Sequence, residues 1–130
     1  MNEAVRALVV RHCETLRREA ETIAAALAVA QPDRAAAFKL VHRIKGSSGS
    51  LGFPGISDLA LRLEATLRAC ADRPPTPQEV ATIDRLHGRL QADIAAIAPE
   101  QSTLYQRVGA GSGARSAGPQ DQPSRSSSGR

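Results

Sequence analysis

Residues 41–52 read VHRIKGSSGSLG, and the spacing of their small and apolar members predicts a helix. One stripe recurs at steps of three and four residues, at Val41, Ile44, Ser48 and Leu51. Because a stripe of this kind must be covered by other parts of the chain, the stretch predicts one amphipathic member of a helical bundle.

A second stripe of the same helix should face outward, and it holds His42, Lys45, Gly46 and Gly49. Each glycine inside a helix costs about 1 kcal/mol relative to alanine, so two of them on one face need a reason other than helix stability. Missing side chains one and two turns after His42 would clear an area where a partner can approach the imidazole. Close packing against a neighbouring helix remains an alternative use for both glycines.

Three further segments have helical periodicity. The first has its apolar stripe at Val5, Leu8, Val9, His12, Leu16, Ala20, Ile23 and Leu27. The helix that holds residues 41–52 begins near Asp33, after Pro32, and ends around residues 52–55, a run rich in helix breakers. A third stripe follows at Ile56, Leu59, Leu63 and Leu67.

Residues 76–79 predict the start of the last helix: they read TPQE, which is typical of a capping box with proline in the first turn. Its apolar stripe is Val80, Ile83, Leu86, Leu90, Ile94 and Ile97. Four amphipathic helices with short connections predict an all-α fold, an antiparallel four-helix bundle with a long N-terminal helix.

Residues 1–98 should form this bundle, and residues 99–130 differ from them in composition. A short helical extension is expected through Leu104, Tyr105 and Val108. From Gly109 to Arg130 the chain is rich in Gly, Ser and Arg and has almost nothing to bury, so we expect a disordered C-terminal tail.

Composition limits the classes of function that the chain can have. With 130 residues, 42% of them hydrophobic and 2% aromatic, the chain suits one domain with an aliphatic core. Its net charge of +4 comes from scattered residues, and without a dense basic tract or stacking aromatics we expect no nucleic-acid binding.

The sequence also indicates a cytoplasmic protein with no membrane partner. No N-terminal apolar run resembles a signal peptide, and Arg or Glu interrupts every stretch long enough to span a bilayer. Cys13 and Cys70 fit neither a metal site nor a disulfide framework, so we interpret both as small buried hydrophobic residues.

The residue types on the outward stripe favour phosphoryl chemistry at His42. The like charge of Lys45 favours the neutral, nucleophilic imidazole, and its ammonium group can stabilise charge on phosphoryl oxygens. The sequence has no acidic metal cluster and no nucleotide-binding loop, so we expect no cofactor and no metal site. His12 and His87 lack such neighbours and are expected to be ordinary surface residues.

The motif His42-x-x-Lys45-Gly46, continued by SSGxLG at residues 47–52, resembles the signature of histidine phosphotransfer (HPt) domains. A Leu-Glu pair at residues 63–64 matches one that is common in that family. The resemblance implies a helical bundle that carries its histidine on the second helix. It also implies a phosphocarrier rather than an enzyme, which takes phosphate from an aspartate of one receiver domain and passes it to another.

Roles for individual residues follow from the resemblance. His42 would be the phosphoacceptor, Lys45 the phosphate-stabilising cation and Gly46 the position of steric clearance. Residues expected in partner docking are Phe38, Lys39, Arg43, Gly49 and Glu64.

The expected partners are receiver domains of response regulators and hybrid histidine kinases, with Mg²⁺ supplied by the receiver. Some family members carry glutamine where this chain has Glu64, and an acid there would repel phosphate unless it is paired with Lys45 or Arg68. Lys39 and Arg43 either steer an acidic partner or are simply solvated charges.

Two further alternatives stay open. The bundle could use its glycine-rich face to bind or sequester a signalling partner without any phosphate passing through His42. We also expect a monomer, because the docking face must stay free, whereas an apolar patch around Phe38 and Phe53 would pair two copies weakly.

Overall fold

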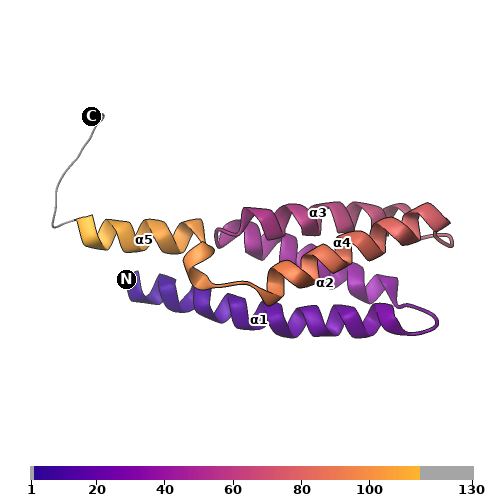
Figure 1. Ribbon diagram of the computed structural model, residues 1–130, viewed down its shortest axis with the longest axis horizontal. Helices are drawn as coiled ribbons and strands as arrows, with labels where there is room; N and C mark the ends of the chain where they lie inside the picture. Colours follow the sequence, from indigo (N-terminus) through magenta and orange to yellow (C-terminus); the bar gives the residue numbers. More distant parts are fainter. Residues whose placement is uncertain (1, 115–130) are drawn as a thin grey trace, which may run out of the picture.

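The computed structural model describes residues 2–114, and helices account for almost all of them (Figure 1). The elements are α1 (Asn2–Ala28), α2 (Arg34–Ser50), α3 (Pro54–Ala69), α4 (Pro77–Ala95), the 3₁₀ turn η1 (Pro99–Gln101) and α5 (Thr103–Ala114). No strand occurs within residues 2–114, so the all-α prediction is confirmed.

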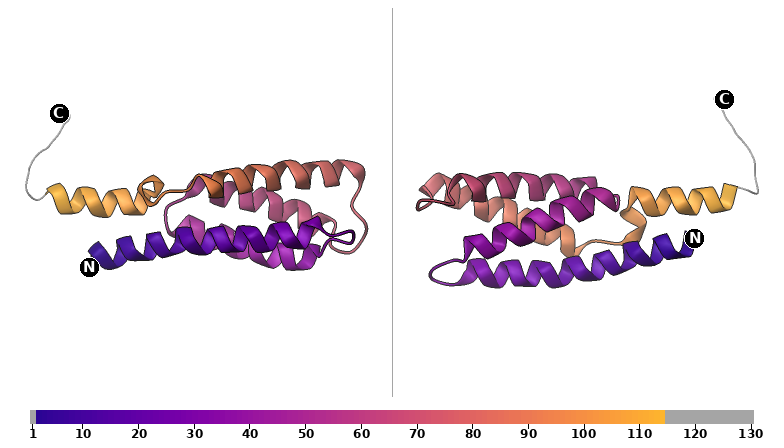
Figure 2. Two further views of the ribbon diagram at one scale, coloured as in Figure 1. Left: turned by 60° about the horizontal axis from the view of Figure 1, so that its bottom comes forward. Right: turned by 180° about the vertical axis from the view of Figure 1, so that it is seen from behind.

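Helices α1 to α4 form an antiparallel bundle, and α1 is the longest of them (Figures 1 and 2). Each helix packs against two others: α2 lies between α1 and α3, and α4 lies between α3 and α1. The diagonal pairs are α1 with α3 and α2 with α4. The predicted four-helix arrangement is therefore present, with α2 and α3 as immediate neighbours.

The predicted helix starts are confirmed by their caps. Asp33 precedes α2 and accepts a hydrogen bond from the backbone N–H of Ala36 at 3.0 Å. Thr76 and Glu79 form the capping box of α4, with each side chain bonded to the other residue's backbone N–H. The same Glu79 binds the Arg73 guanidinium, which with the cap lowers the pKa of its carboxyl to about 2.

The core of the bundle is aliphatic, as the composition predicts. Cys13 and Cys70 are each 2% exposed and unpaired, so the interpretation as small buried hydrophobic residues is confirmed. Phe53 is also in the core, at 4% exposure. An apolar surface patch shared by Phe38 and Phe53 therefore does not form, and that prediction is wrong.

His12 is not the surface residue that we expected. It is 7% exposed on α1, and its Nε2 lies 3.1 Å from the hydroxyl of Ser48, which is fully buried on α2. The ring also packs against Phe53. Burial lowers the pKa of His12, because water no longer stabilises the imidazolium form. His87 is half-buried on α4 and accepts a hydrogen bond from the amide of Gln91.

The C-terminal extension is longer than predicted. Helix α5 continues past Gly109, where we expected disorder, as far as residue 114 and lies beside the N-terminal part of α1 (Figures 1 and 2). The Arg6 guanidinium stacks over the ring of Tyr105, 5.3 Å from its centroid, and its Nη2 lies where a side chain at Gly109 would be. Packing against α1 thus offsets the low helix propensity of glycine. The remainder of the expected tail, residues 115–130, lies outside the described residues.

A glycine turn joins the extension to the bundle. Gly52, between α2 and α3, has a φ of +91°, a conformation that favours glycine. Its carbonyl accepts the backbone N–H of Thr103 at 2.9 Å, and the buried Ser102 hydroxyl donates to the carbonyl of Leu51 at 2.6 Å. A Cβ at Gly52 would lie 2.6 Å from the backbone nitrogen of Leu104. The extension therefore packs directly on the end of α2.

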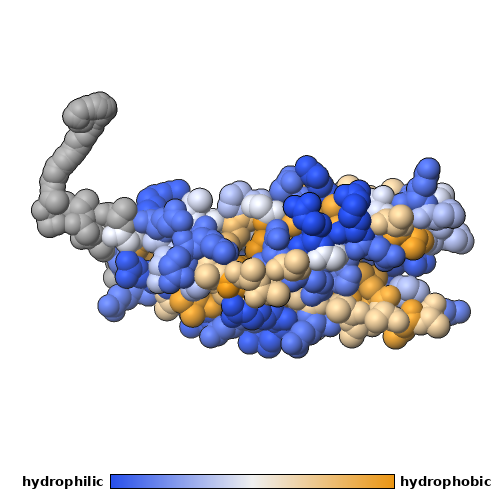
Figure 3. Space-filling model, viewed as in Figure 1, coloured by the Kyte–Doolittle hydropathy of each residue, from blue (hydrophilic) through white to orange (hydrophobic). Residues whose placement is uncertain are grey.

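The surface is mostly hydrophilic, and apolar colour gathers over the C-terminal end of α1 (Figure 3). Val29, just after that helix, is 54% exposed. Within residues 2–114 no helix has both the length and the apolar character needed to cross a membrane.

Candidate functional site

The outward stripe of α2 lies along its seam with α3. His42 is on this stripe, and 59% of its side chain is exposed. Its ring Nδ1 is hydrogen-bonded to Oε2 of Glu64, which projects from α3. The two residues meet because α2 and α3 are antiparallel neighbours.

Glu64 is the centre of the site and is almost completely buried, at 2% exposure. Its Oε1 accepts a hydrogen bond from Lys45 Nζ at 2.7 Å, and Nη2 of Arg68 lies 3.5 Å from its Oε2. A buried carboxylate needs such partners, because a charge removed from water is costly unless it is paired. We expected Glu64 to be a docking residue, and this is wrong because it offers no surface to a partner.

The charge of Glu64 determines which imidazole nitrogen is free. The hydrogen bond from Lys45 is the main cause that lowers the pKa of Glu64; burial opposes it, and the bond to His42 adds to it. An ionised carboxylate only accepts hydrogen bonds, so Nδ1 of His42 carries the hydrogen and donates it. In the neutral ring the lone pair is then on Nε2, which has no hydrogen-bond partner within residues 2–114.

Lys45 acts on the imidazole less directly than the sequence suggested. Its side chain is 29% exposed and its ammonium group is bonded to Glu64, so the carboxylate lies between the ammonium group and the imidazole. The positive charge of Lys45 is therefore balanced by Glu64. The ion pair of Lys45 and Glu64 fixes the orientation and the tautomer of the imidazole.

The two glycines of the outward stripe differ in their surroundings. A Cβ at Gly46 would meet nothing within 4 Å, so this position is open. A Cβ at Gly49 would lie 3.2 Å from Oγ of Ser57 on α3. That same hydroxyl donates to the carbonyl of Lys45 at 2.8 Å. Gly46 leaves clear space beside His42, whereas Gly49 allows α3 to approach α2.

Phe38 and Arg68 lie near His42 on the side opposite to Gly46, toward the start of α2. The ring of Phe38, one turn before His42, stacks on the imidazole with centroids 6.2 Å apart and an interplanar angle of 14°. The guanidinium of Arg68 lies 5.4 Å from the Phe38 centroid. Arg68 thus contacts both Phe38 and Glu64, and it joins the aromatic and the charged parts of the site.

Lys39 and Arg43 are exposed, and neither side chain is bonded to His42 or Glu64. Arg43 is on the α1 side of α2, where its Nε lies 3.2 Å from Glu19 Oε2. Lys39 has no ion-pair partner within residues 2–114. Leu61 was not among the residues expected at the site; it is 49% exposed and lies on the same side of α3 as Ser57 and Glu64. An apolar residue on an otherwise polar stripe was the available signal.

Among residues 2–114, no group of three or more His, Cys, Asp or Glu side chains is arranged to hold a metal ion. Buried Glu64 is instead matched by three nitrogen-bearing side chains.

Comparison with known proteins agrees with this geometry. The model of the family described as "Hpt domain" matches residues 7–98, which include all of α2, α3 and α4 and most of α1. No curated protein and no solved structure gave a significant match. Helix α5 lies beyond the matched range. The matched range covers more than half of the chain, and the chain therefore belongs to the Hpt domain family, whose general role is histidine phosphotransfer in phosphorelays.

Proposed function

We propose that this protein accepts a phosphoryl group on Nε2 of His42 from the aspartyl phosphate of one receiver domain and passes it to the aspartate of another. The observation that supports this most directly is the hydrogen bond between Nδ1 of His42 and buried Glu64. It leaves Nε2 as the nucleophilic nitrogen at a 59% exposed side chain, next to open space at Gly46.

The transfer step follows from this geometry. The Nε2 lone pair attacks phosphorus, the bond from phosphorus to the aspartate oxygen breaks, and the carboxylate leaves with the electron pair. The ring becomes positively charged as the N–P bond forms. Glu64 stabilises this charge through Nδ1–H, so the carboxylate interacts more strongly with the product than with the neutral ring. The reverse steps deliver the phosphoryl group to the next receiver.

In this scheme Lys45 would interact with the phosphoryl group as well as with Glu64. Its ammonium group lies one helical turn from His42, is partly exposed and is bonded to Glu64. Phosphoryl oxygens on Nε2 would offer it additional acceptors, and Lys45 would then neutralise part of their charge. The protein would act as a carrier without a kinase activity of its own, and Mg²⁺ would belong to the receiver.

The test is transfer of labelled phosphate from a phosphorylated receiver domain, with Mg²⁺, to the full chain. Wild type should acquire acid-labile label, whereas His42→Ala should acquire none and keep its helical circular dichroism, because His42 is exposed. His87→Ala is the matched control and should label like wild type. Absence of label with every cognate receiver, together with stable binding to one of them, would favour a phosphate-independent binding module.

A further inference from the structure

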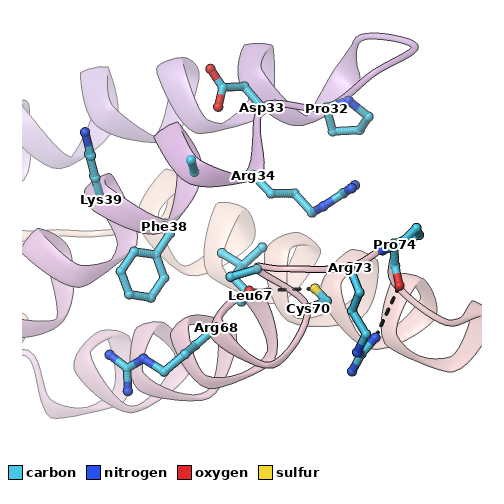
Figure 4. Close-up of a pocket in the computed structure, with 12 residues that line it drawn as sticks. Pro32, Asp33, Arg34, Phe38, Lys39, Leu67, Arg68, Cys70, Arg73 and Pro74 are labelled. Carbon is cyan, nitrogen blue, oxygen red and sulfur yellow. Dashed lines mark hydrogen bonds between the residues drawn. The ribbon is translucent and has the colours of Figure 1, made fainter.

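A groove lies at one end of the bundle, where α2 begins and α3 ends (Figure 4). Its volume is about 680 Å³. Apolar side chains from both helices line it, including Phe38, Leu67, Cys70 and Ala71. The groove is separate from Nε2 of His42 but shares Phe38 with the site.

The charges around this groove are mostly positive, and two of them are uncompensated. Arg34 and Lys39 line the groove and have no hydrogen-bond or ion-pair partner within residues 2–114. Figure 4 shows Arg34 extending from α2 toward the loop that holds Arg73 and Pro74. Arg73 is already bound to Glu79 by two hydrogen bonds of 2.7 and 2.8 Å. The single acid of the lining, Asp33, is bonded to the backbone as the cap of α2.

The combination of volume, apolar lining and free cations indicates one class of ligand. Sites for small molecules usually measure about 300–1,000 Å³ and combine apolar walls with a few polar groups. We propose that this groove binds a small amphiphilic anion, with its apolar body against Phe38 and Leu67 and its acidic group at Arg34. Figure 4 shows Lys39 at the opposite end of the groove, so charge complementarity with the unpaired Arg34 is what favours an anion over a neutral ligand.

A ligand in the groove would alter the contacts of His42. Phe38 lines the groove and stacks on the imidazole, and Arg68 lines it while contacting both Phe38 and Glu64. A ligand that packs on Phe38, or draws Arg68 away from Glu64, therefore changes the surroundings of His42. Binding itself does not depend on the proposed phosphotransfer, so it can be tested without any partner.

The probe is anilinonaphthalene sulfonate, titrated into the full chain, with uncharged phenylnaphthylamine as the matched ligand. We expect saturable one-to-one binding of the sulfonate and weaker binding of the uncharged amine. The variant Arg34→Gln should weaken sulfonate binding about tenfold or more. The control Arg85→Gln makes the same change of charge on an exposed residue of α4 and should bind like wild type.

Two further measurements locate the ligand. Ala71→Trp should fill the groove and abolish binding; Ala71 is exposed, so the substitution leaves the core intact. In nuclear magnetic resonance spectra the probe should shift the signals of Ala71 and the ring signals of His42. Equal affinity for the two ligands, or sulfonate binding unchanged in either Arg34→Gln or Ala71→Trp, would overturn the proposal.

Discussion

Nδ1 of His42 donates a hydrogen bond to Oε2 of Glu64 across the seam between α2 and α3. One residue is largely exposed and the other is 2% exposed, so a buried charge orients a surface nucleophile. The hydrogen bond from Lys45 is the main group interaction that keeps that carboxyl ionised, and Nη2 of Arg68 lies 3.5 Å from it. This relationship explains how an acid can lie beside the histidine that we propose as the phosphoryl acceptor.

Removal of the Glu64 carboxylate should slow phosphoryl acceptance. Glu64→Ala frees the imidazole to rotate and to change tautomer, and a hydrogen bond to a charged group contributes about 1.5–3 kcal/mol, so we expect a loss of about 10- to 100-fold. Glu64→Gln keeps an oxygen that can accept the Nδ1 hydrogen and should lose less. Single-turnover transfer of label from a phosphorylated receiver measures both, and equal rates for wild type and Glu64→Ala would contradict the orienting role.

A large side chain at position 46 should block the approach of a partner to His42 without destabilising the protein. A Cβ there meets nothing within 4 Å, and the same is true of Gly88 on α4, which makes Gly88→Leu a matched control. Both leucine variants should be as stable as wild type or more stable, because each replaces a helical glycine. Gly46→Leu should slow transfer about tenfold or more, since the side chain intrudes on the partner's approach. Normal transfer by Gly46→Leu would show that this space is not used.

Among the glycines whose surroundings the structure describes, Gly52 should be the most sensitive to substitution. Gly52→Ala places a Cβ in a backbone with a φ of +91° and 2.6 Å from the nitrogen of Leu104, so we expect a loss of about 2 kcal/mol or more in the free energy of unfolding. Gly55→Ala is the control, because a Cβ there meets nothing within 4 Å.

Urea denaturation of both variants, repeated on a chain that ends at residue 98, separates the backbone strain at Gly52 from its close contact with residues 102–104. Without residues 102–104 only the backbone strain remains, so the cost of Gly52→Ala should fall. If Gly52→Ala lowers the free energy of unfolding equally in both chains, the contact of residues 102–104 with the turn does not contribute to that loss.

Stability should decrease in mild acid because of His12. Burial lowers its pKa in the folded protein, so the unfolded chain binds the proton at higher pH. The stabilisation is thus complete above the ordinary pKa of about 6.5 and is lost as the pH falls below it, by at most about 1.4 kcal/mol per pH unit. His12→Gln should flatten this loss in urea unfolding between about pH 7 and about pH 5.5. His87, whose pKa burial also lowers, acts in the same direction, so the comparison uses a His87→Gln background.

The sequence was sufficient where local chemistry determines structure. The helix starts after Asp33 and Thr76 depend on side chains bonding to backbone only three residues away, so both could be predicted. The exposure of His42 followed from helical spacing, and the choice of Lys45 or Arg68 as partners of Glu64 followed from charge.

What could not be predicted depends on how helices lie against one another. His12 was misjudged because its partner, Ser48, is on another helix and comes within reach only in the folded bundle. The length of α5 was underestimated because glycine-rich composition disfavours helix, whereas packing of Arg6 against Tyr105 and Gly109 favours it. The separate uses of Gly46 and Gly49 likewise depend on the position of Ser57 on α3.

The single free nitrogen of His42 has a kinetic consequence for the proposed relay. Donor and acceptor must both reach the same atom, through the same open space at Gly46, so they cannot occupy the protein together. Turnover should therefore alternate between the two in a ping-pong scheme, and each receiver, when unphosphorylated and in excess, should compete with the other for access. The ratio of receiver concentrations in the cell would then set the rate of signal flow as much as the affinity of either partner.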